Sequence, residues 1–325
     1  MVDLIHVHGS HNHFYILDQT ELNTPLVHDE LVALAQKFCQ KNAFWPGADG
    51  ILVVDEPTHS GPVGKMTVVN ADGSIASMCG NGLRTVTRYL SEKTGQKEFT
   101  VETAEADLRV AQAADFAKGV PAFSVEISPV LFNKEAFPFD NLGFDNIVNE
   151  KLPAINDHLS FTAIAVPNPH LISFVDSDQD LKETLGEIGQ RLNGKNQYFP
   201  DGVNVNFAKI LGPNKLFVRT FERGVGFTNA CGTGMSATSF AFALIHPEMI
   251  DLSQSISVFN PGGMVKTNVH PNAEHPWIEL IGNATFLDKV SLDESDLHQA
   301  KLEESNFTIT KTNEETAYQA FVESL

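Results

Sequence analysis

Residues 79–93 read CGNGLRTVTRYLSEK, and residues 231–245 read CGTGMSATSFAFALI. Each stretch opens with Cys-Gly-x-Gly, continues as an apolar helix-forming segment, and follows a polar turn that contains glycine. The second copy stands nearly half the chain after the first, which indicates a duplicated unit. We therefore expect two similar domains, each with a largely β wall around one central helix.

Short strand-like runs separated by Gly, Pro, Asn and Asp fill most of the remaining chain. Helical periodicity predicts two further helices, over residues 29–41 and 181–192. The predicted fold class is α/β, or α+β, with two pseudo-symmetric β-rich domains and the active site in the cleft between them.

The predicted domain boundaries follow from the two copies. Residues 1–126 form the N-terminal domain, which we expect residues 286–293 to rejoin, and residues 127–285 form the C-terminal domain. Residues 294–325 form a C-terminal extension with strand alternation in NFTITKT and a helical pattern after Asn313. We expect this extension to be a structural element without chemistry.

The composition limits the partners and the compartment. Twenty-two basic and 41 acidic residues leave a formal charge of −19, whose field opposes binding to nucleic acid or to an anionic membrane. No apolar run is long enough to span a membrane, and the N-terminus does not have the pattern of a signal peptide. Three cysteines are too few for a disulfide framework and suit a reducing cytoplasm. We expect a cytoplasmic protein, with a homodimer as one candidate assembly.

The position of two cysteines directly before two helices carries the chemistry. A helix start presents unpaired N–H groups, which stabilise a thiolate and can bind a carboxylate. Two such groups on opposite faces of an α-carbon can remove a proton from one face and deliver one to the other. Cys79 and Cys231 are therefore the predicted acid/base pair of an amino-acid epimerase that needs no cofactor. Cys39 lacks this setting and is expected to be a packing residue.

Further motifs accompany the two cysteines. They are H-G-x-x-N-x-F (His8–Phe14), G-A-D-G (Gly47–Gly50), N-A-D-G-S before the first cysteine (Asn70–Ser74), N-P-H (Asn168–His170), N-V-N-F (Asn204–Phe207) and E-R-G-V-G before the second (Glu222–Gly226). In this order, across residues 1 to about 293, the chain resembles the diaminopimelate epimerase family. The resemblance implies interconversion of LL- and meso-diaminopimelate without pyridoxal phosphate or metal, on the way to lysine and peptidoglycan.

The resemblance also implies individual roles. Cys79 and Cys231 would exchange the proton, while His170 and Glu222 would tune or orient them. The residues expected around the small-molecule substrate are Asn12, Asn70, Gly80, Asn81, Asn168, Asn204, Glu222, Arg223, Gly232 and Thr233. Among them, Arg223 would bind the distal carboxylate, since a planar guanidinium suits that group. The sequence departs from the family pattern at His13, where Asp is usual, and at Phe227, where Glu is common.

The N-terminal histidines and two arginines after Cys79 are expected to have structural roles. His6 and His8 are expected on one side of a strand, with His11 and His13 in the following turn, and we expect no metal there. Arg84 and Arg88, one turn apart on a helix, are expected to form a surface or domain-interface pair.

Three other functions remain open at this stage. One is a cofactor-independent racemase of another amino acid, such as proline or hydroxyproline, although Asn81 stands where such proteins usually carry His. The second is a cysteine hydrolase that pairs one thiol with a histidine such as His170. The third is a binding module without catalysis.

Overall fold

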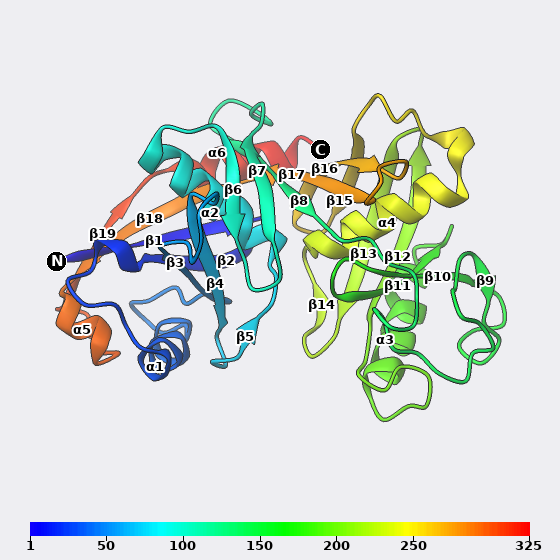
Figure 1. The fold of residues 1–325 in the computed structure, drawn as a ribbon, viewed down its shortest axis with the longest axis horizontal. Helices are drawn as coiled ribbons and strands as arrows, with labels where there is room; N and C mark the ends of the chain where they lie inside the picture. Colours follow the sequence, from blue (N-terminus) through cyan, green and yellow to red (C-terminus); the bar gives the residue numbers. More distant parts are fainter. The chain divides into compact units, whose positions relative to one another are not determined.

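The computed structural model describes residues 1–325, which form two compact units. The first unit comprises residues 1–125 and 281–325, and the second comprises residues 126–280. One long helix lies among the strands of each unit, α2 (Gly80–Thr94) in the first and α4 (Gly232–Ile245) in the second (Figure 1). None of the helices has the length and apolar character that crossing a membrane requires.

The first unit is mainly strands. Its elements are β1 (Val2–Gly9), β2 (Asn12–Asp18), the 3₁₀ turn η1 (Gln19–Glu21), α1 (His28–Phe38), β3 (Gly50–Asp55), β4 (Gly64–Asn70), β5 (Ile75–Ala76), α2, β6 (Glu98–Glu102), β7 (Asp107–Gln112), β8 (Ala122–Ile127), β18 (Thr285–Leu292), α5 (Glu294–His298), β19 (Phe307–Lys311) and α6 (Glu314–Glu323). The strand β8 leads out of this unit, and β18 begins just after the chain returns to it.

The second unit has the same character. Its elements are β9 (Glu150–Lys151), β10 (Ser160–Ala165), β11 (Pro169–Phe174), the π-helical turn η2 (Asp180–Thr184), α3 (Leu185–Asn193), β12 (Asn204–Gly212), β13 (Lys215–Glu222), β14 (Gly226–Thr228), α4, the 3₁₀ turn η3 (Pro247–Met249), β15 (Ile256–Asn260), β16 (Gly263–His270) and β17 (Trp277–Asn283).

The strand pairings of the two units repeat one another. In the first unit β1 runs antiparallel to β2, β2 parallel to β3, and β3 antiparallel to β4, which also pairs antiparallel to β5 and parallel to β6. In the second unit β10, β11, β12, β13, β14 and β15 pair in the same order and with the same directions. The predicted mixed α/β fold with two pseudo-symmetric, β-rich domains is confirmed.

The two central helices are buried along most of their length. Every residue of α4 from Gly232 to Phe242 is buried, as are ten of the fifteen residues of α2. The hydroxyl groups on these helices donate to carbonyls one turn back, as Ser236 does to Gly232 and Thr87 does to Leu83. The helix α4 carries no charged residue, and the exposed charged residues of α2, Glu92 and Lys93, stand in its last turn. Both helices can therefore lie inside their units with strands around them.

The predicted helices are present with small shifts at their ends. The helix predicted over residues 29–41 is α1 and ends at Phe38, and the one predicted over 181–192 begins as the π-helical turn η2 and continues as α3. The strand and the helix predicted in the C-terminal extension are β19 and α6. His13 was expected in a turn and instead belongs to β2, because the β1–β2 turn contains only two residues.

The helix α3 packs so closely on β13 that one position requires glycine. A Cβ added at Gly189 would lie inside the Phe221 side chain, 2.8 Å from its Cβ, whereas a Cβ at Gly194 would meet nothing closer than 3.4 Å. We expect Gly189→Ala to lower the thermal midpoint of the protein, since overpacking of this kind costs about 1–3 kcal/mol. Gly194→Ala, at the C-cap of the same helix, serves as the control and should leave the midpoint unchanged or slightly higher. Equal midpoints for the two variants in differential scanning calorimetry would contradict this packing.

Candidate active site

Cys79 is the N-cap residue of α2. Its Sγ accepts the backbone N–H of Gly82 over 3.3 Å, and its thiol donates to Asn12 Oδ1 over 3.8 Å. Asn81 Nδ2 donates to the same Asn12 oxygen over 3.2 Å. Three residues that the sequence predicted for the site, Asn12, Cys79 and Asn81, therefore lie together at the start of this helix.

Asp49, which the sequence analysis did not single out, holds Asn12 in place. One Asp49 carboxylate oxygen accepts Asn12 Nδ2 over 2.7 Å and the backbone N–H of His13 over 2.8 Å. This leaves Asn12 Oδ1 for the thiol and for Asn81. Asp49 belongs to the G-A-D-G motif. The motif indicates that this segment matters but does not predict the contact with Asn12.

Cys231 is the N-cap residue of α4 and is buried. Its Sγ accepts the N–H of Gly234 over 3.4 Å and lies 3.5 Å from Thr233 Oγ1. Burial raises the pKa of this thiol well above its ordinary value, and the negative charge and hydrogen bond of Glu222 raise the pKa further. Thr228 Oγ1 donates to Glu222 over 2.6 Å and so fixes the carboxylate beside the sulfur. In this arrangement Cys231 is held as a thiol.

His170 is fully buried near Cys231 and is hydrogen-bonded to the residues around that thiol. Asn206 Nδ2 donates to His170 Nδ1 over 3.0 Å, which places the ring proton on Nε2. His170 Nε2 lies 3.0 Å from Asn168 Oδ1 and 3.1 Å from Thr233 Oγ1. Burial lowers the pKa of His170 to about 3, so the ring is neutral. Its only basic nitrogen is occupied by Asn206, and His170 therefore orients its neighbours instead of accepting a proton from Cys231.

The remaining predicted residues of the second unit are placed around the same strand ends. Asn204 is buried, and its Oδ1 accepts the backbone N–H of Arg223 over 2.9 Å. The Arg223 side chain is exposed and donates from Nη1 to the Asp201 carbonyl over 3.0 Å. In the first unit Asn70 is half-buried and donates from Nδ2 to Ser74 Oγ over 2.9 Å. Asn70 stabilises the turn that follows it, and Asn204 stabilises the turn that begins at Arg223.

The repeated topology shows how the two halves differ. His170 pairs with Asn204 across β11 and β12 where Phe14 pairs with Gly50 across β2 and β3. The second unit therefore builds its thiol site on buried polar side chains, whereas the first uses apolar ones at the same positions. The alternation in N-V-N-F indicates that Asn204 and Asn206 lie on the same face of β12. It does not indicate that Asn206 binds His170.

Arg84 and Arg88 are buried, contrary to the expectation of a surface or domain-interface pair. Arg84 is fully buried and donates to the carbonyls of Asn283 and Gly80 over 3.3 and 3.5 Å. Burial lowers the pKa of Arg84 to about 10, and the guanidinium therefore stays cationic at neutral pH. Its positive charge attracts negative charge on Cys79, in the same sense as the helix start does.

The histidine cluster is a hydrogen-bonded group. His8, His11 and Glu315 place one possible ligand atom each within 4.8 Å of one another. His8 Nδ1 accepts the backbone N–H of His11 over 3.1 Å, which puts the ring proton on Nε2, 2.8 Å from Glu315 Oε2. In that tautomer Nε2 has no lone pair for a metal. His8 and Glu315 are therefore placed as donor and acceptor.

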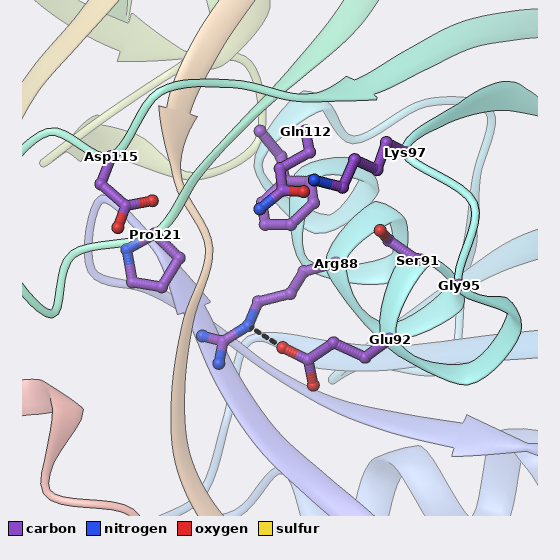
Figure 2. Close-up of a pocket in the computed structure, with 9 residues that line it drawn as sticks. Arg88, Ser91, Glu92, Gly95, Lys97, Gln112, Asp115 and Pro121 are labelled. Atoms are coloured by element: carbon purple, nitrogen blue, oxygen red, sulfur yellow. Dashed lines mark hydrogen bonds and ion pairs between the residues drawn. The ribbon is translucent and has the colours of Figure 1, made fainter.

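A separate surface pocket of about 450 Å³ lies along α2, away from its N-cap. Figure 2 shows Arg88 paired with Glu92 over 2.7 Å in this pocket, with Lys97 and Gln112 nearby. The lining mixes charges of both signs and contains none of the predicted site residues.

The family profile and the relatives of high sequence identity agree on one family. A family profile described as "Diaminopimelate epimerase" matches residues 5–130 and 162–287. The chain is 54% identical over its whole length to the diaminopimelate epimerase of Lactiplantibacillus plantarum, of which it covers 98%, and 49% identical over its whole length to that of Ligilactobacillus salivarius, of which it covers 99%.

Solved structures share the fold at low identity. A phenazine biosynthesis protein of the PhzF family from Bacillus anthracis has a TM-score of 0.59 at 14% identity and covers 89% of this chain and 97% of its own. A hydroxyproline epimerase from Agrobacterium vitis has a TM-score of 0.57 at 14% identity and covers 88% of this chain and 91% of its own. These similarities show the fold alone.

The depressed pKa of His170 leads to a pH prediction. Because its folded pKa of about 3 lies below the ordinary value of 6.5, its contribution to stability is complete above about pH 6.5 and is lost as the pH falls toward 3. We expect histidine NMR to show His170 neutral, with the proton on Nε2, between pH 5 and 8 (about the range in which an ordinary histidine titrates). His59, whose pKa a hydrogen bond to Asp107 raises, is the internal control and should titrate there. A titration of His170 near its ordinary pKa would contradict the network described above.

Proposed function

Because the chain belongs to the diaminopimelate epimerase family, we propose that it inverts the α-carbon of LL-diaminopimelate to give meso-diaminopimelate. The observation that carries the proposal is the pair of N-cap cysteines, each with a glycine N–H on its sulfur. The close relatives support diaminopimelate as the substrate. The reaction belongs to the synthesis of lysine and of peptidoglycan precursors.

The proposed chemistry is a proton exchange between two thiols. One cysteine, as thiolate, takes the α-proton from one face, and the other, as thiol, delivers its proton to the opposite face. The electron pair left on the α-carbon returns to the new C–H bond, so that no oxidant, reductant or cofactor is consumed. For the reverse reaction, Cys79 and Cys231 exchange roles. Closure of the protein over the substrate would keep water from the carbanion.

Each thiol site would contribute differently to this exchange. Glu222 favours the protonated form of Cys231 and so prepares it as the proton donor. His170, fixed by Asn206, orients Thr233 and Asn168 instead of taking a proton itself. Cys79 is then the base of this direction, and once it has taken the α-proton the amide oxygen of Asn12 accepts its S–H bond.

The substrate is held at two ends in this proposal. At the reacting end, Asn12, Asn81 and the backbone N–H groups at the two helix starts would stabilise the charge that develops on the carboxylate. Those backbone groups belong to Gly80, Asn81, Gly232 and Thr233. At the distal end, Asn70, Asn168 and Asn204 would bind the second amino and carboxylate groups, with Arg223 on the carboxylate.

The alternatives receive less support. A racemase of proline or hydroxyproline shares the fold at low identity, whereas the relatives near half identity are diaminopimelate epimerases. A cysteine hydrolase would need a histidine base on its thiol, whereas burial makes His170 a weak base and its basic nitrogen already accepts a hydrogen bond from Asn206. A binding module without catalysis leaves two matched thiol sites unexplained.

We also propose that the protein works in the cytoplasm, where its three free thiols would stay reduced. Its substrate is a small amino acid, and the acidic composition continues to disfavour nucleic acid as a partner. A homodimer remains the candidate assembly, which sedimentation equilibrium of the purified protein would test.

Removal of either thiol tests the proposed mechanism. We expect Cys79→Ala and Cys231→Ala each to slow epimerisation of LL-diaminopimelate by roughly a thousandfold or more, since general acid–base groups contribute on this scale. Cys39→Ala is the matched control, because Cys39 is a buried thiol at the end of α1 whose pKa burial raises to about 12, and it should keep full activity. The assay uses the untagged protein without added cofactor, with circular dichroism to show that each variant is folded.

Two outcomes would contradict the proposal. A fully active Cys79→Ala or Cys231→Ala protein would exclude the exchange between two thiols. A wild-type protein that racemises proline or hydroxyproline and not diaminopimelate would leave the chemistry in place and overturn the substrate.

A further inference from the structure

The turn between β1 and β2 is strained. It consists of Ser10 and His11 alone, with φ angles of +55° and +59°. This geometry is typical of a type I′ hairpin, in which both central positions favour Gly or Asn because a Cβ is disfavoured at positive φ. Such a backbone persists only where surrounding contacts determine it. The next residue in the chain is Asn12, whose oxygen faces the Cys79 thiol.

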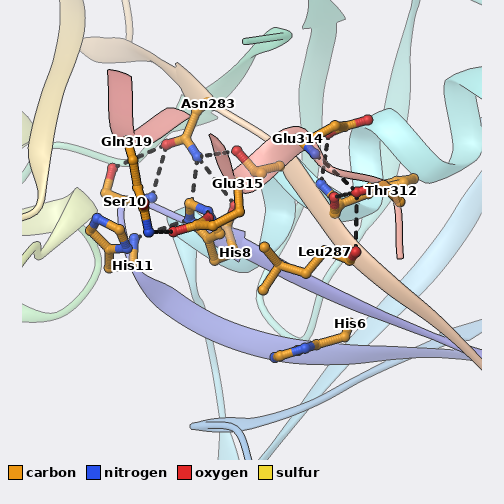
Figure 3. Close-up of polar contacts among 12 residues, drawn as sticks. His6, His8, Ser10, His11, Asn283, Leu287, Thr312, Glu314, Glu315 and Gln319 are labelled. Atoms are coloured by element: carbon orange, nitrogen blue, oxygen red, sulfur yellow. Dashed lines mark hydrogen bonds and ion pairs between the residues drawn. The ribbon is translucent and has the colours of Figure 1, made fainter. Parts of the chain in front are cut away.

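A distant side chain, that of Asn283, and a local one, that of His8, bind the two N–H groups of this turn. Asn283 Oδ1 accepts the N–H of Ser10 over 2.8 Å, and His8 Nδ1 accepts the N–H of His11 over 3.1 Å. Figure 3 shows Asn283 joined to both Ser10 and His8. Arg84 adds a bond from Nη2 to Ser10 Oγ over 3.4 Å. The strained backbone therefore depends on the orientation of these side chains.

Arg84 is fully buried and closely packed. A Cβ at Gly9 would lie 2.9 Å from its Nη2, and a Cβ at Gly282 would lie 2.6 Å from its Nε. The guanidinium is thus enclosed between two glycines at the back of the turn. It connects Ser10 to the Gly80 carbonyl in the first turn of α2, directly after Cys79.

The C-terminal helix α6 completes this enclosure. Glu315 accepts a hydrogen bond from His8 Nε2 over 2.8 Å. This keeps the ring proton on Nε2 and leaves Nδ1 free to accept the backbone N–H of His11. Tyr318 is fully buried, is hydrogen-bonded to Ser10, and places its ring against His8 and His11 with centroids 4.8 and 5.1 Å away. This helix therefore contacts the turn through both polar and ring contacts.

A second contact fastens α6 to the same central helix. Glu314, its first residue, accepts two bonds from Arg88 over 2.6 and 2.7 Å and also the backbone N–H of Phe286. Arg88 stands one turn after Arg84 on α2. The helix α6 is thus anchored to α2 by one arginine and reaches the turn beside the other.

We propose that the C-terminal helix α6 is a positioning element of the Cys79 site, in which Tyr318 and Glu315 hold the strained Ser10–His11 turn and thereby hold Asn12 against the thiol. The catalytic consequence rests on the proposed two-thiol function, whereas the effect on Cys79 itself does not. Residues 288–325 lie beyond the part of the chain that the family profile matches. The extension thus has a function that the sequence pattern did not indicate.

The test compares two thiols of the same molecule. Wild type, Tyr318→Phe, Glu315→Ala and Glu315→Gln are treated with iodoacetamide, and the alkylation rates of Cys79 and Cys231 are followed by peptide mass spectrometry. Cys231 is the internal control, since its described contacts involve no residue of α6. Thr316→Ala is the matched control on α6, because this residue is exposed and lies between the two positioning residues.

We expect Cys79 to react several-fold faster in Tyr318→Phe and Glu315→Ala, with Cys231 unchanged, because Asn12 no longer holds the S–H bond. Glu315→Gln should restore most of the wild-type rate, since an amide oxygen still accepts from His8. In the epimerase assay the impaired variants should lose about tenfold or more in kcat with KM nearly constant, as loss of alignment at the reacting atoms predicts. Thr316→Ala should match the wild type in both measurements.

An unchanged Cys79 rate in both Tyr318→Phe and Glu315→Ala would overturn the proposal, and so would equal changes at Cys79 and Cys231, which indicate a general loosening of the fold. The alkylation readout needs no substrate. A protein without epimerase activity whose Cys79 still responds to these variants would therefore contradict the proposed function and leave the role of α6 intact.

Discussion

The hydrogen bond from a backbone N–H to a cysteine sulfur at each helix start is the constraint on which the rest of the structure depends. It requires glycine three residues after the cysteine: a Cβ at Gly82 would collide with Leu52, and one at Gly234 would collide with Asn206. The first turns of α2 and α4 therefore lie in close contact with β3 and β12. Each unit therefore forms strands around a helix whose first turn bears a thiol.

The same constraint is satisfied by different means in the two units. At Cys231 a polar network of Glu222, Thr233 and His170 lies around the sulfur, and its members stand on β13, α4 and β11. At Cys79 the polar partner is Asn12, on a strained turn that the C-terminal helix supports. Two thiols with the same helix geometry thus receive different electrostatic surroundings, which suits a reaction in which one begins as base and the other as acid.

The sequence predicted the local features well. The Cys-Gly-x-Gly starts, the four main helices and the repeated β-rich architecture all follow from short-range patterns, and the fold is confirmed. The contacts that it did not predict join distant segments. Arg84 was expected to belong to a surface or domain-interface pair, but carbonyls and a serine hydroxyl enclose it. His8 and Glu315 stand near opposite ends of the chain, and a local sequence pattern cannot predict a contact between such distant residues.

Proton exchange between two thiols is most directly tested by following LL-diaminopimelate in deuterated water, with early time points analysed by mass spectrometry. The thiol that donates has exchanged with solvent, while the other retains the proton taken from the substrate. We therefore predict that newly formed meso product carries one deuterium at the inverted carbon and that unreacted LL substrate keeps its protium. Product that keeps the substrate's own proton, or deuterium that enters unreacted LL substrate as fast as product, would contradict the mechanism.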